Sequence, residues 1–205
     1  DSTNRIQDPL APKDREVERG SIEFKDVTFS YPGAEQPILS NVSFSTKPGE
    51  VTAIIGGTGS GKSTLINLIP RFYDIDEGSI LFDGVDIRDM TQACLRAKIG
   101  FVPQKALLFS GTIGDNIRVG KEDATDEEVM SAADIAQAIE FISDLEDGLD
   151  SMTTQGGTNL SGGQKQRLSI ARALVRQPAL YIFDDSFSAL DFKTDAKLRS
   201  ALKEE

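Results

Sequence analysis

The stretch that decides the fold is Gly56-Gly57-Thr58-Gly59-Ser60-Gly61-Lys62-Ser63, between the apolar run Val51–Ile55 and a helical pattern from Lys62 to about Ile69. It fits the pattern G-x-x-x-x-G-K-[ST] of a phosphate-binding loop. Glycines let such a loop curl with its backbone N–H groups pointing inward, and the start of the following helix adds partial positive charge. Lys62 is placed to reach the β- and γ-phosphates of a nucleotide, and the Ser63 hydroxyl to ligate Mg²⁺. The motif therefore predicts a nucleotide phosphate site, preceded by a buried parallel strand over Val51–Ile55.

Composition limits the other chemistries that are open to the chain. Its 205 residues suffice for one substantial domain, and a hydrophobic content of 39% excludes a disordered or fibrous chain. With no histidine and the single cysteine Cys94, catalysis by Ser-His or Cys-His pairs, histidine-ligated zinc and a disulfide framework are all excluded. No apolar run reaches the roughly 18 residues of a membrane-spanning helix and no signal-peptide pattern opens the chain, so we expect a soluble fragment.

The negative charge is concentrated in one segment. The net charge is -11, and residues 122–150 hold eleven acids and no base, so the rest of the chain is balanced at 22 acids and 22 bases. A solvated acidic face on a helical subdomain is the simplest interpretation, and a docking face for a basic partner loop is the alternative. Nucleic acid is not an expected partner, because phosphate backbones require a basic stripe.

Along the chain, strands alternate with helices. Residues 1–20 are charged, contain two prolines and cannot bury a core, so we expect a linker there and ordered structure from Ile22. The near-alternating run Ile22–Phe29 and the run Val42–Phe44 predict an antiparallel sheet. Further strands are expected at 79–82, 99–102 and 180–184, and helices near 91–97, 125–142, 162–176 and from 190 to the end. This order predicts an α/β fold.

The helix expected at 125–142 has the strongest local signals. Thr125 and Glu128 have the spacing of a capping box, and apolar residues recur with helical period. We expect that stripe to pack in the core; it consists of Val129, Ala132, Ile135, Ile139 and Ile142.

A strand ending in carboxylates complements the phosphate loop. Leu180-Tyr181-Ile182-Phe183 is apolar and is followed by Asp184, which can hold Mg²⁺ at the carboxyl edge of a sheet. Asp185 follows at once, where a carboxylate that activates water would be useful. A strand that ends in aspartate is weak evidence by itself. It indicates a nucleotide site specifically only together with the phosphate loop.

Glycines begin a second helix as well. Leu160-Ser161-Gly162-Gly163-Gln164 precedes the basic helix Lys165–Ala173, which offers a second anion-binding helix start in the same chain. Two such ends favour two half-sites that complete each other across a dimer.

Together these motifs resemble the nucleotide-binding domain of an ABC transporter of the multidrug or lipid exporter type. The resemblance runs from about residue 20 to the last residue. It implies a P-loop NTPase (RecA-like) parallel sheet core with an N-terminal antiparallel β subdomain and an inserted α-helical subdomain at about 105–157. In this interpretation residues 1–20 are the linker from an absent transmembrane domain, and residues 21–205 are a nucleotide-binding domain truncated at its C-terminus.

The resemblance also implies roles for residues. Tyr31 matches the aromatic residue that stacks on adenine, and Gln104 the glutamine that touches Mg²⁺ and senses the membrane domain. Residues Gly56 to Thr64 would hold the phosphates of ATP, with Lys62 at the γ-phosphate and Mg²⁺ bound by Ser63, Gln104 and Asp184. The signature residues Ser161, Gly162, Gly163 and Gln164 would meet the γ-phosphate of ATP on the opposite subunit, and the segment Ser188–Asp191 would line the dimer seam. Two further segments, Arg71–Asp74 and Leu108–Ile113, resemble exporter versions.

Three departures from the family pattern matter. Asp185 stands where hydrolytic members carry glutamate, and a carboxylate misplaced by more than about 1 Å can lower the rate about 10²-fold. Gln155 stands where many exporters have glutamate in the loop that touches the membrane domain. The sequence has no switch histidine, but it stops fourteen residues after Asp191, before the region that would carry one, so nothing follows from this about the natural protein.

These departures favour one subclass, an exporter built from two unlike halves. The expected function is to bind MgATP, with slow hydrolysis at Asp185, and to lend Ser161 to the site of a non-identical second nucleotide-binding domain. The chain would act at the cytoplasmic face of a membrane, through the coupling loops of its own transmembrane domain. A fully hydrolytic homodimeric exporter is the alternative. A soluble ABC ATPase outside transport is disfavoured, because only 104 positions separate Gly56 from Leu160 and leave no room for a coiled-coil insertion.

Overall fold

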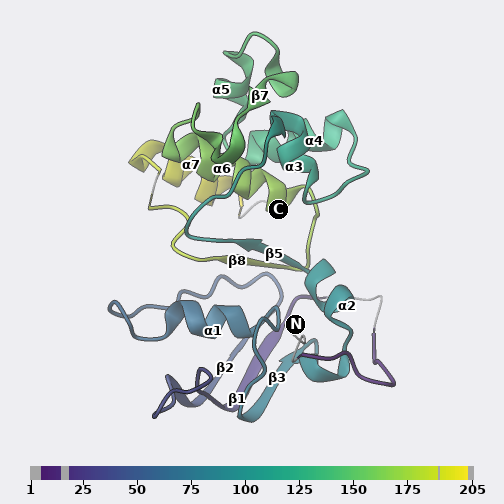
Figure 1. The fold of residues 1–205 in the computed structure, drawn as a ribbon, viewed down its shortest axis with the longest axis vertical. Coiled ribbons are helices and arrows are strands. Elements are labelled where there is room, and N and C mark those ends of the chain that lie inside the picture. The colour runs from purple at the N-terminus through teal and green to yellow at the C-terminus, as the bar shows by residue number, and fades with distance from the viewer. Residues whose placement is uncertain (1–5, 15–18, 189, 203–205) are drawn as a thin grey trace. The chain divides into compact units, whose positions relative to one another are not determined.

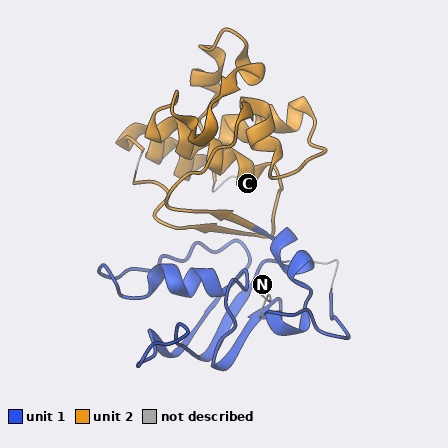
Figure 2. Cartoon of the chain, in the orientation of Figure 1, with its two compact units in different colours: residues 1–99 blue, residues 100–205 orange. Residues whose placement is uncertain are grey.

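A computed structural model describes residues 6–14, 19–188 and 190–202. The chain divides into two compact units, residues 1–99 and residues 100–205, shown in Figure 1 and coloured separately in Figure 2. The first unit contains an antiparallel sheet and the second is mainly helical.

The sheet of the first unit has the strand order β2-β1-β3-β4. Its strands are β1 (Ile22–Phe29), β2 (Leu39–Thr46), β3 (Glu77–Phe82) and β4 (Val85–Asp86). β1 pairs antiparallel with both β2 and β3, which confirms the antiparallel sheet predicted at the front of the chain. The alternation in β1 is imperfect because its pairing register shifts after Phe24, where Asp26 has a φ of 48°. This bulge lets Phe24 and Val27 both face the core.

Two short helices complete the first unit: α1 (Lys62–Leu68) and α2 (Gln92–Ala97), with the 3₁₀ turn η1 (Ile87–Asp89) before α2. Both helices lie where they were expected. α2 begins after Thr91, whose hydroxyl accepts a hydrogen bond from the N–H of Cys94 at 3.1 Å. This cap satisfies one of the N–H groups that a helix start leaves without a partner.

The expected strand over residues 51–55 is not formed. The segment has no regular secondary structure, and Val51 and Ile55 are 82% and 93% exposed. A strand is held by ladder hydrogen bonds to its neighbours, and the antiparallel sheet of this unit does not include the segment. The apolar run has the composition of a strand. In the described structure, however, it belongs to none of the sheets, so it lacks the paired neighbours that a strand needs.

The N-terminal residues also differ from expectation. We expected ordered structure only from Ile22, yet the described residues 6–14 are hydrogen-bonded to η1, to the start of α2 and to Arg71. Charged side chains that cannot build a core can still bind polar groups on a surface, which composition alone does not reveal.

The second unit is built around its longest helix, α6. Its helices are α3 (Ile113–Arg118), α4 (Asp126–Ile135), α5 (Ile139–Ser143), α6 (Gly162–Leu174) and α7 (Phe192–Ala201), with 3₁₀ turns η2 (Gly148–Asp150) and η3 (Gln155–Gly157). Its strands are β5 (Ile99–Val102) paired with β8 (Leu180–Phe183), and β6 (Gly111–Thr112) paired antiparallel with β7 (Met152–Thr153). The sequence did not indicate α3, β6 or β7.

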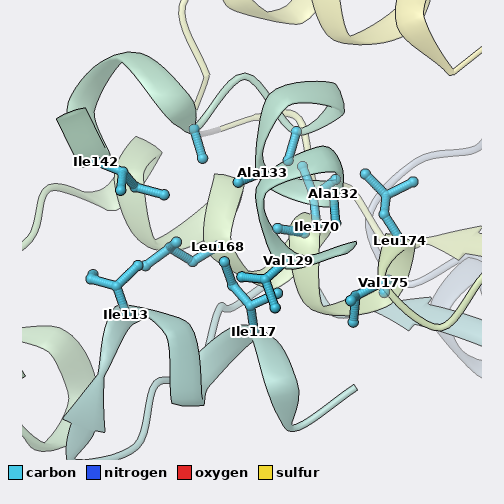
Figure 3. Packing of buried hydrophobic residues seen from close by; sticks show 14 of the residues in the cluster. Ile113, Ile117, Val129, Ala132, Ala133, Ile142, Leu168, Ile170, Leu174 and Val175 are labelled. Carbon is cyan, nitrogen blue, oxygen red and sulfur yellow. The ribbon is translucent and has the colours of Figure 1, made fainter. Parts of the chain in front are cut away.

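The core of the second unit lies where α3, α4 and α6 pack together, as Figure 3 shows. Val129, Leu168, Ile170 and Ile117 are fully buried there. Val129, Ala132 and Ile142 belong to the core, and Ile135 and Ile139 pack against it, so the predicted apolar stripe is confirmed as core packing. Of the eleven acids between residues 122 and 150 all but the half-buried Glu128 are exposed, as expected for a solvated face.

The helix expected over 125–142 is interrupted. Its capping box is present, with the Thr125 hydroxyl accepting from the N–H of Glu128 and the Glu128 carboxylate accepting from the N–H of Thr125. The helix ends at Ile135, however, with Ala136 as its C-cap, because Gln137 adopts a φ of 58° before α5 begins. A left-handed residue cannot continue a right-handed helix, and the sequence carries no glycine here to announce it.

Candidate nucleotide site

The glycine-rich loop of the first unit has the backbone that a phosphate site requires. Gly59 and Gly61 have φ of 78° and 88°, in the left-handed region that glycine adopts without strain. Gly61 is the N-cap of α1, and as a glycine it makes no side-chain cap hydrogen bond. A Cβ on Gly56 would lie 2.5 Å from the Ser60 hydroxyl, so a side chain there would require Ser60 to move. These features fit a bound anion.

The Lys62 ammonium lies over this loop. It donates to the carbonyl oxygens of Gly56 and, at 2.8 Å, of Gly57. The positive charge is therefore held at the concave side of the loop by weak neutral acceptors, for which phosphate oxygens are stronger substitutes. This is the position that the motif predicts for a lysine that binds phosphate.

Tyr31 is linked to the same helix. It lies two residues after the end of β1, and its hydroxyl lies 2.8 Å from the hydroxyl of Thr64, a buried residue of α1. Its ring meets Phe29 and Tyr73 edge-on, at centroid distances of 5.1 and 5.3 Å. The half-buried position of Tyr31 is compatible with the adenine contact that the resemblance implies, but Tyr31 is not part of a strand.

In the second unit, the ends of β5 and β8 bring the expected magnesium and water ligands together. The N–H of Asp184 donates to the carbonyl of Val102 at 2.9 Å, so the last residue of β5 adjoins the first residue after β8. Both strands thus end at the same edge, as parallel strands do. The Gln104 amide lies 3.4 Å from the Asp185 carboxylate.

Two serines fix the turn after β8. The buried hydroxyl of Ser186 donates to the Val102 carbonyl at 2.7 Å, and the hydroxyl of Ser188 donates to the Asp185 carbonyl at 2.9 Å. Asp185 itself has a φ of 46°, an uncommon conformation for a residue other than glycine. Ser186 was not predicted as a functional residue. Its position two residues after Asp184 is the sequence signal that could have identified it. Ala189, in the segment expected at the dimer seam, lies outside the described residues.

The signature residues form a capping box at the start of α6. The Ser161 hydroxyl accepts from the N–H of Gln164, and the Gln164 side chain accepts from the N–H of Ser161 at 2.9 Å. Gln164 therefore has a structural role as part of the helix cap. The spacing S-x-x-Q in the sequence indicates this capping box directly. Around Gly162 a Cβ would meet no atom within 4 Å, so the helix start is open to a ligand or a partner.

α6 is held in place by buried polar contacts. The Gln166 amide donates to the Pro103 carbonyl at 3.3 Å, which joins the signature helix to the segment that carries Gln104. Arg172 donates to the carbonyl oxygens of Asn116 and Leu107 at 2.8 and 2.9 Å, and its burial lowers the pKa of the guanidinium. These residues were not predicted from the sequence, because no local motif marks a contact between distant segments.

At the start of α7 the side chain that caps the helix is a carboxylate, that of Asp191. The Asp191 carboxylate accepts hydrogen bonds from the hydroxyl and the N–H of Thr194, at 2.7 and 3.0 Å. These bonds lower the pKa of Asp191, so it caps the helix as a carboxylate. Burial lowers the pKa of Arg167 on α6, against the opposing attraction of Asp191.

The predicted site residues thus fall in two groups. The first unit holds Tyr31 and the loop 56–64, joined by the hydrogen bond between Tyr31 and Thr64. The second unit holds Gln104 beside Asp184 and Asp185, and the signature residues 161–164 at the start of α6.

Comparison with known proteins identifies the family. Residues 39–188 match the family model described as "ABC transporter", a range that includes every residue of both groups except Tyr31. The chain belongs to the ABC transporter family. The chain is an ABC transporter ATP-binding domain with the P-loop NTPase fold, and the family consists of ATPases. This confirms the prediction made from the motifs.

Individual relatives extend the likeness over the whole chain. The chain is 55% identical, over 89% of its length, to the uncharacterized ABC transporter ATP-binding protein YfiB of Bacillus subtilis. It is 48% identical, over its full length, to the β-(1→2)glucan export ATP-binding/permease protein NdvA of Rhodopseudomonas palustris. It is 45% identical over 96% of its length to a putative multidrug export ATP-binding/permease protein of Staphylococcus aureus.

A solved structure agrees with the fold. A bacterial Atm1-family ABC exporter with ATP bound matches 99% of the chain with a TM-score of 0.94 and 42% identity. The ABC domain described here spans only about a third of each of these proteins: 32% of YfiB, 34% of NdvA and 35% of the exporter chain. Within the described ranges, no helix combines the length and the apolar character that crossing a membrane requires.

Proposed function

We propose that this ABC domain binds MgATP, dimerises head to tail with a second, non-identical nucleotide-binding domain and drives export through an attached transmembrane domain. Its own site hydrolyses ATP slowly, and its signature residues complete the site of the partner. The domain works at the cytoplasmic face of a membrane. The export function is supported by relatives named as export ATP-binding/permease proteins.

The observation that carries the slow-site proposal is Asp185. It occupies the position directly after the magnesium-binding Asp184, where a longer glutamate would extend its carboxylate by one methylene. In the structure the Asp185 carboxylate lies within 3.4 Å of the Gln104 amide. A carboxylate held near its own backbone and engaged by Gln104 is badly placed to orient a water molecule at the γ-phosphate. A displacement of about 1 Å can lower the rate about 10²-fold.

The residues present fit MgATP. Mg²⁺ keeps several of its waters and binds through one or two carboxylates plus the phosphates of a nucleotide, so Asp184 is a sufficient carboxylate ligand, and the resemblance adds Ser63 and Gln104 as oxygen ligands. When bound, Mg²⁺ neutralises the charge of the phosphate oxygens. Lys62 binds the phosphates, Tyr31 is available to the adenine, and the open helix start at Gly162 faces the partner's nucleotide in the proposed dimer.

The signature residues support a role in trans. The capping box orients Ser161, and the tie between Gln166 and Pro103 fixes α6 relative to the Gln104 segment. A change at Gln104 would therefore reach the start of α6, which is the half-site that this chain offers to its partner. In this proposal the main effect of bound ATP is to stabilise the dimer of the two domains.

ATP turnover tests the proposal. We expect turnover near background for the unmodified chain in its full-length transporter, and a rise of about 10²-fold for Asp185→Glu. Brisk turnover of the unmodified protein that falls by orders of magnitude with Asp185→Asn would support a fully hydrolytic homodimer instead. Lys62→Ala is the control for binding: it should abolish the rise in melting temperature that ATP causes. If the rise persists, the phosphate loop is not the site.

A further inference from the structure

Arg71 is a buried arginine that the proposed function does not use. It is 5% exposed and lies three residues after α1, the helix that begins at the phosphate loop. Its φ is 55°, and its N–H donates to the carbonyl of Leu68 at 3.1 Å, so its backbone is tied to the last turn of α1. Any displacement of Arg71 is therefore transmitted to the helix that carries Lys62.

The Arg71 guanidinium joins two other segments. Its Nε donates to the Asp74 carboxylate at 2.7 Å, and its Nη2 donates to Asp74 and to the carbonyl of Gln7, both at 3.2 Å. Nη1 is buried and has no hydrogen-bond partner among the described residues. A buried charge with one donor unsatisfied depends strongly on the contacts that it does make. The bond to Gln7 is the one that connects it to the N-terminal segment, residues 6–14.

The N-terminal segment is anchored at the start of α2. Asp8 accepts from the N–H of Gln92 at 2.8 Å, and Asp14 accepts from both the N–H and the hydroxyl of Thr91 at 2.9 Å. These bonds lower the pKa of Asp14, chiefly through the N–H of Thr91. The segment thus binds α2 through two carboxylates and reaches Arg71 through a backbone carbonyl.

α2 reaches the same residue from the other side. Arg96 donates from Nη2 to the carbonyl of Arg71 at 2.9 Å and from Nε to the carbonyl of Pro70 at 3.0 Å. The N-terminal segment, α2 and the end of α1 therefore converge on Arg71. Its side chain makes the direct link to the N-terminal segment, whereas its backbone makes the link to α2.

We propose that Arg71 is a positioning residue that couples the N-terminal segment to the phosphate-loop helix α1, so that detaching this segment loosens α1 and weakens ATP binding. The inference rests on the proposed ATP binding at Lys62. It assigns a role to the Arg71–Asp74 motif and gives the part of the chain before β1 a direct route to the nucleotide. Pulling on residues 6–14 acts through the Gln7 carbonyl on Arg71, and from there on the backbone of α1.

Detachment of the segment is the perturbation to make. The double variant Asp8→Ala/Asp14→Ala removes the two carboxylate anchors at α2 without altering any side chain bonded to Arg71, and leaves only the weaker bond from the Gln92 amide to the Ile6 carbonyl at 3.2 Å there. Lys13→Ala is the matched control, because it removes only an ion pair with Asp89 in which the lysine side chain is 67% exposed. We expect the double variant to bind trinitrophenyl-ATP about fivefold more weakly and the control to bind it unchanged.

A double-mutant cycle isolates the side-chain route. Arg71→Lys keeps the charge and the backbone carbonyl used by Arg96, but a single ammonium cannot reproduce the fork that holds Asp74 and Gln7 together. On the Arg71→Lys background, the Asp8→Ala/Asp14→Ala pair should change the affinity by less than about twofold. An equal fivefold loss on both backgrounds would overturn the proposal.

Hydrogen exchange gives a readout that needs neither nucleotide nor the Arg71 variant. Amide exchange over residues 62–71 should speed up in Asp8→Ala/Asp14→Ala, while β3 and β4 exchange as before. Unchanged exchange in α1 would refute the coupling even if Arg71→Lys fails to fold. Absence of nucleotide binding by the unmodified chain would count against the proposed function and leave the exchange result to decide the coupling.

Discussion

Asn116 on α3 offers the sharpest test of how the second unit is held together. It is 2% exposed, and its carboxamide makes five hydrogen bonds to three other segments. Oδ1 accepts from the N–H of Phe109 at 2.9 Å and from Arg172 at 3.2 Å. Nδ2 donates to the carbonyl oxygens of Phe109 and Thr112 and to the hydroxyl of Thr153, at 2.9 to 3.0 Å. The perturbation is Asn116→Ala.

The expected cost follows from which groups lose their partners. The Phe109 carbonyl keeps the hydroxyl of Thr153 at 2.8 Å, and Arg172 keeps two backbone carbonyls. The N–H of Phe109 loses its bond to the Asn116 carboxamide, and such a hydrogen bond contributes about 0.5–1.5 kcal/mol net. With the net value of the other bonds added, the free energy of unfolding should fall by about 3 kcal/mol.

Urea unfolding followed by circular dichroism measures this change. For an m-value of about 2 kcal/mol/M, the midpoint should fall by about 1.5 M. Asn159→Ala is the matched control: this asparagine is exposed and bonds the Met152 carbonyl at 3.1 Å, so its loss should cost less than about 0.5 kcal/mol. If Asn116→Ala costs no more than Asn159→Ala, the buried network does not stabilise the unit and the reasoning is refuted.

Two further outcomes are expected. Ser161→Ala and Thr125→Ala each remove a capping-box hydroxyl and should lower the free energy of unfolding by about 1 kcal/mol, read from urea midpoints; no change in either would deny the cap its energetic role. Asp83 is partly desolvated, which raises its pKa, but hydrogen bonds from the N–H groups of Arg19, Gly20 and Ser21 outweigh this and leave the pKa below its usual value. The resulting stability is present above the ordinary pKa of about 4 and is lost as the pH falls through the lowered pKa, so thermal midpoints of Asp83→Asn should fall less steeply below pH 4 than those of the unmodified chain.

Local signals in the sequence predicted most of the helices and strands. Thr125 and Glu128 announce the start of α4, and the strand ends at Val102 and Phe183 follow from short apolar runs bounded by polar residues or proline. These predictions succeed because capping and short-range periodicity involve residues within one or two turns of each other. The same signal at Ser161 and Gln164 correctly places the start of α6, although we first interpreted those residues only as ligand contacts.

The failures concern contacts between distant residues. Val51–Ile55 reads as a buried strand, but a strand exists only where neighbours pair with it. Gln137 adopts a left-handed conformation between α4 and α5, at a position that no glycine or proline marks in the sequence. Ordered structure was expected only from Ile22, yet two carboxylates of residues 6–14 accept hydrogen bonds from N–H groups at the start of α2.

The sequence by itself determined the family, the phosphate loop and the residue types at each expected ligand position, because these are matters of spacing within short motifs. Only the tertiary structure decided that Gln104 meets Asp185, that Asn116 and Arg172 hold α6, and that Arg71 joins the N-terminal segment to α1. Each of these contacts joins residues that lie 56 to 81 positions apart in the sequence. Pairings over such separations depend on how the whole chain closes its loops and buries its polar groups, which no local pattern encodes.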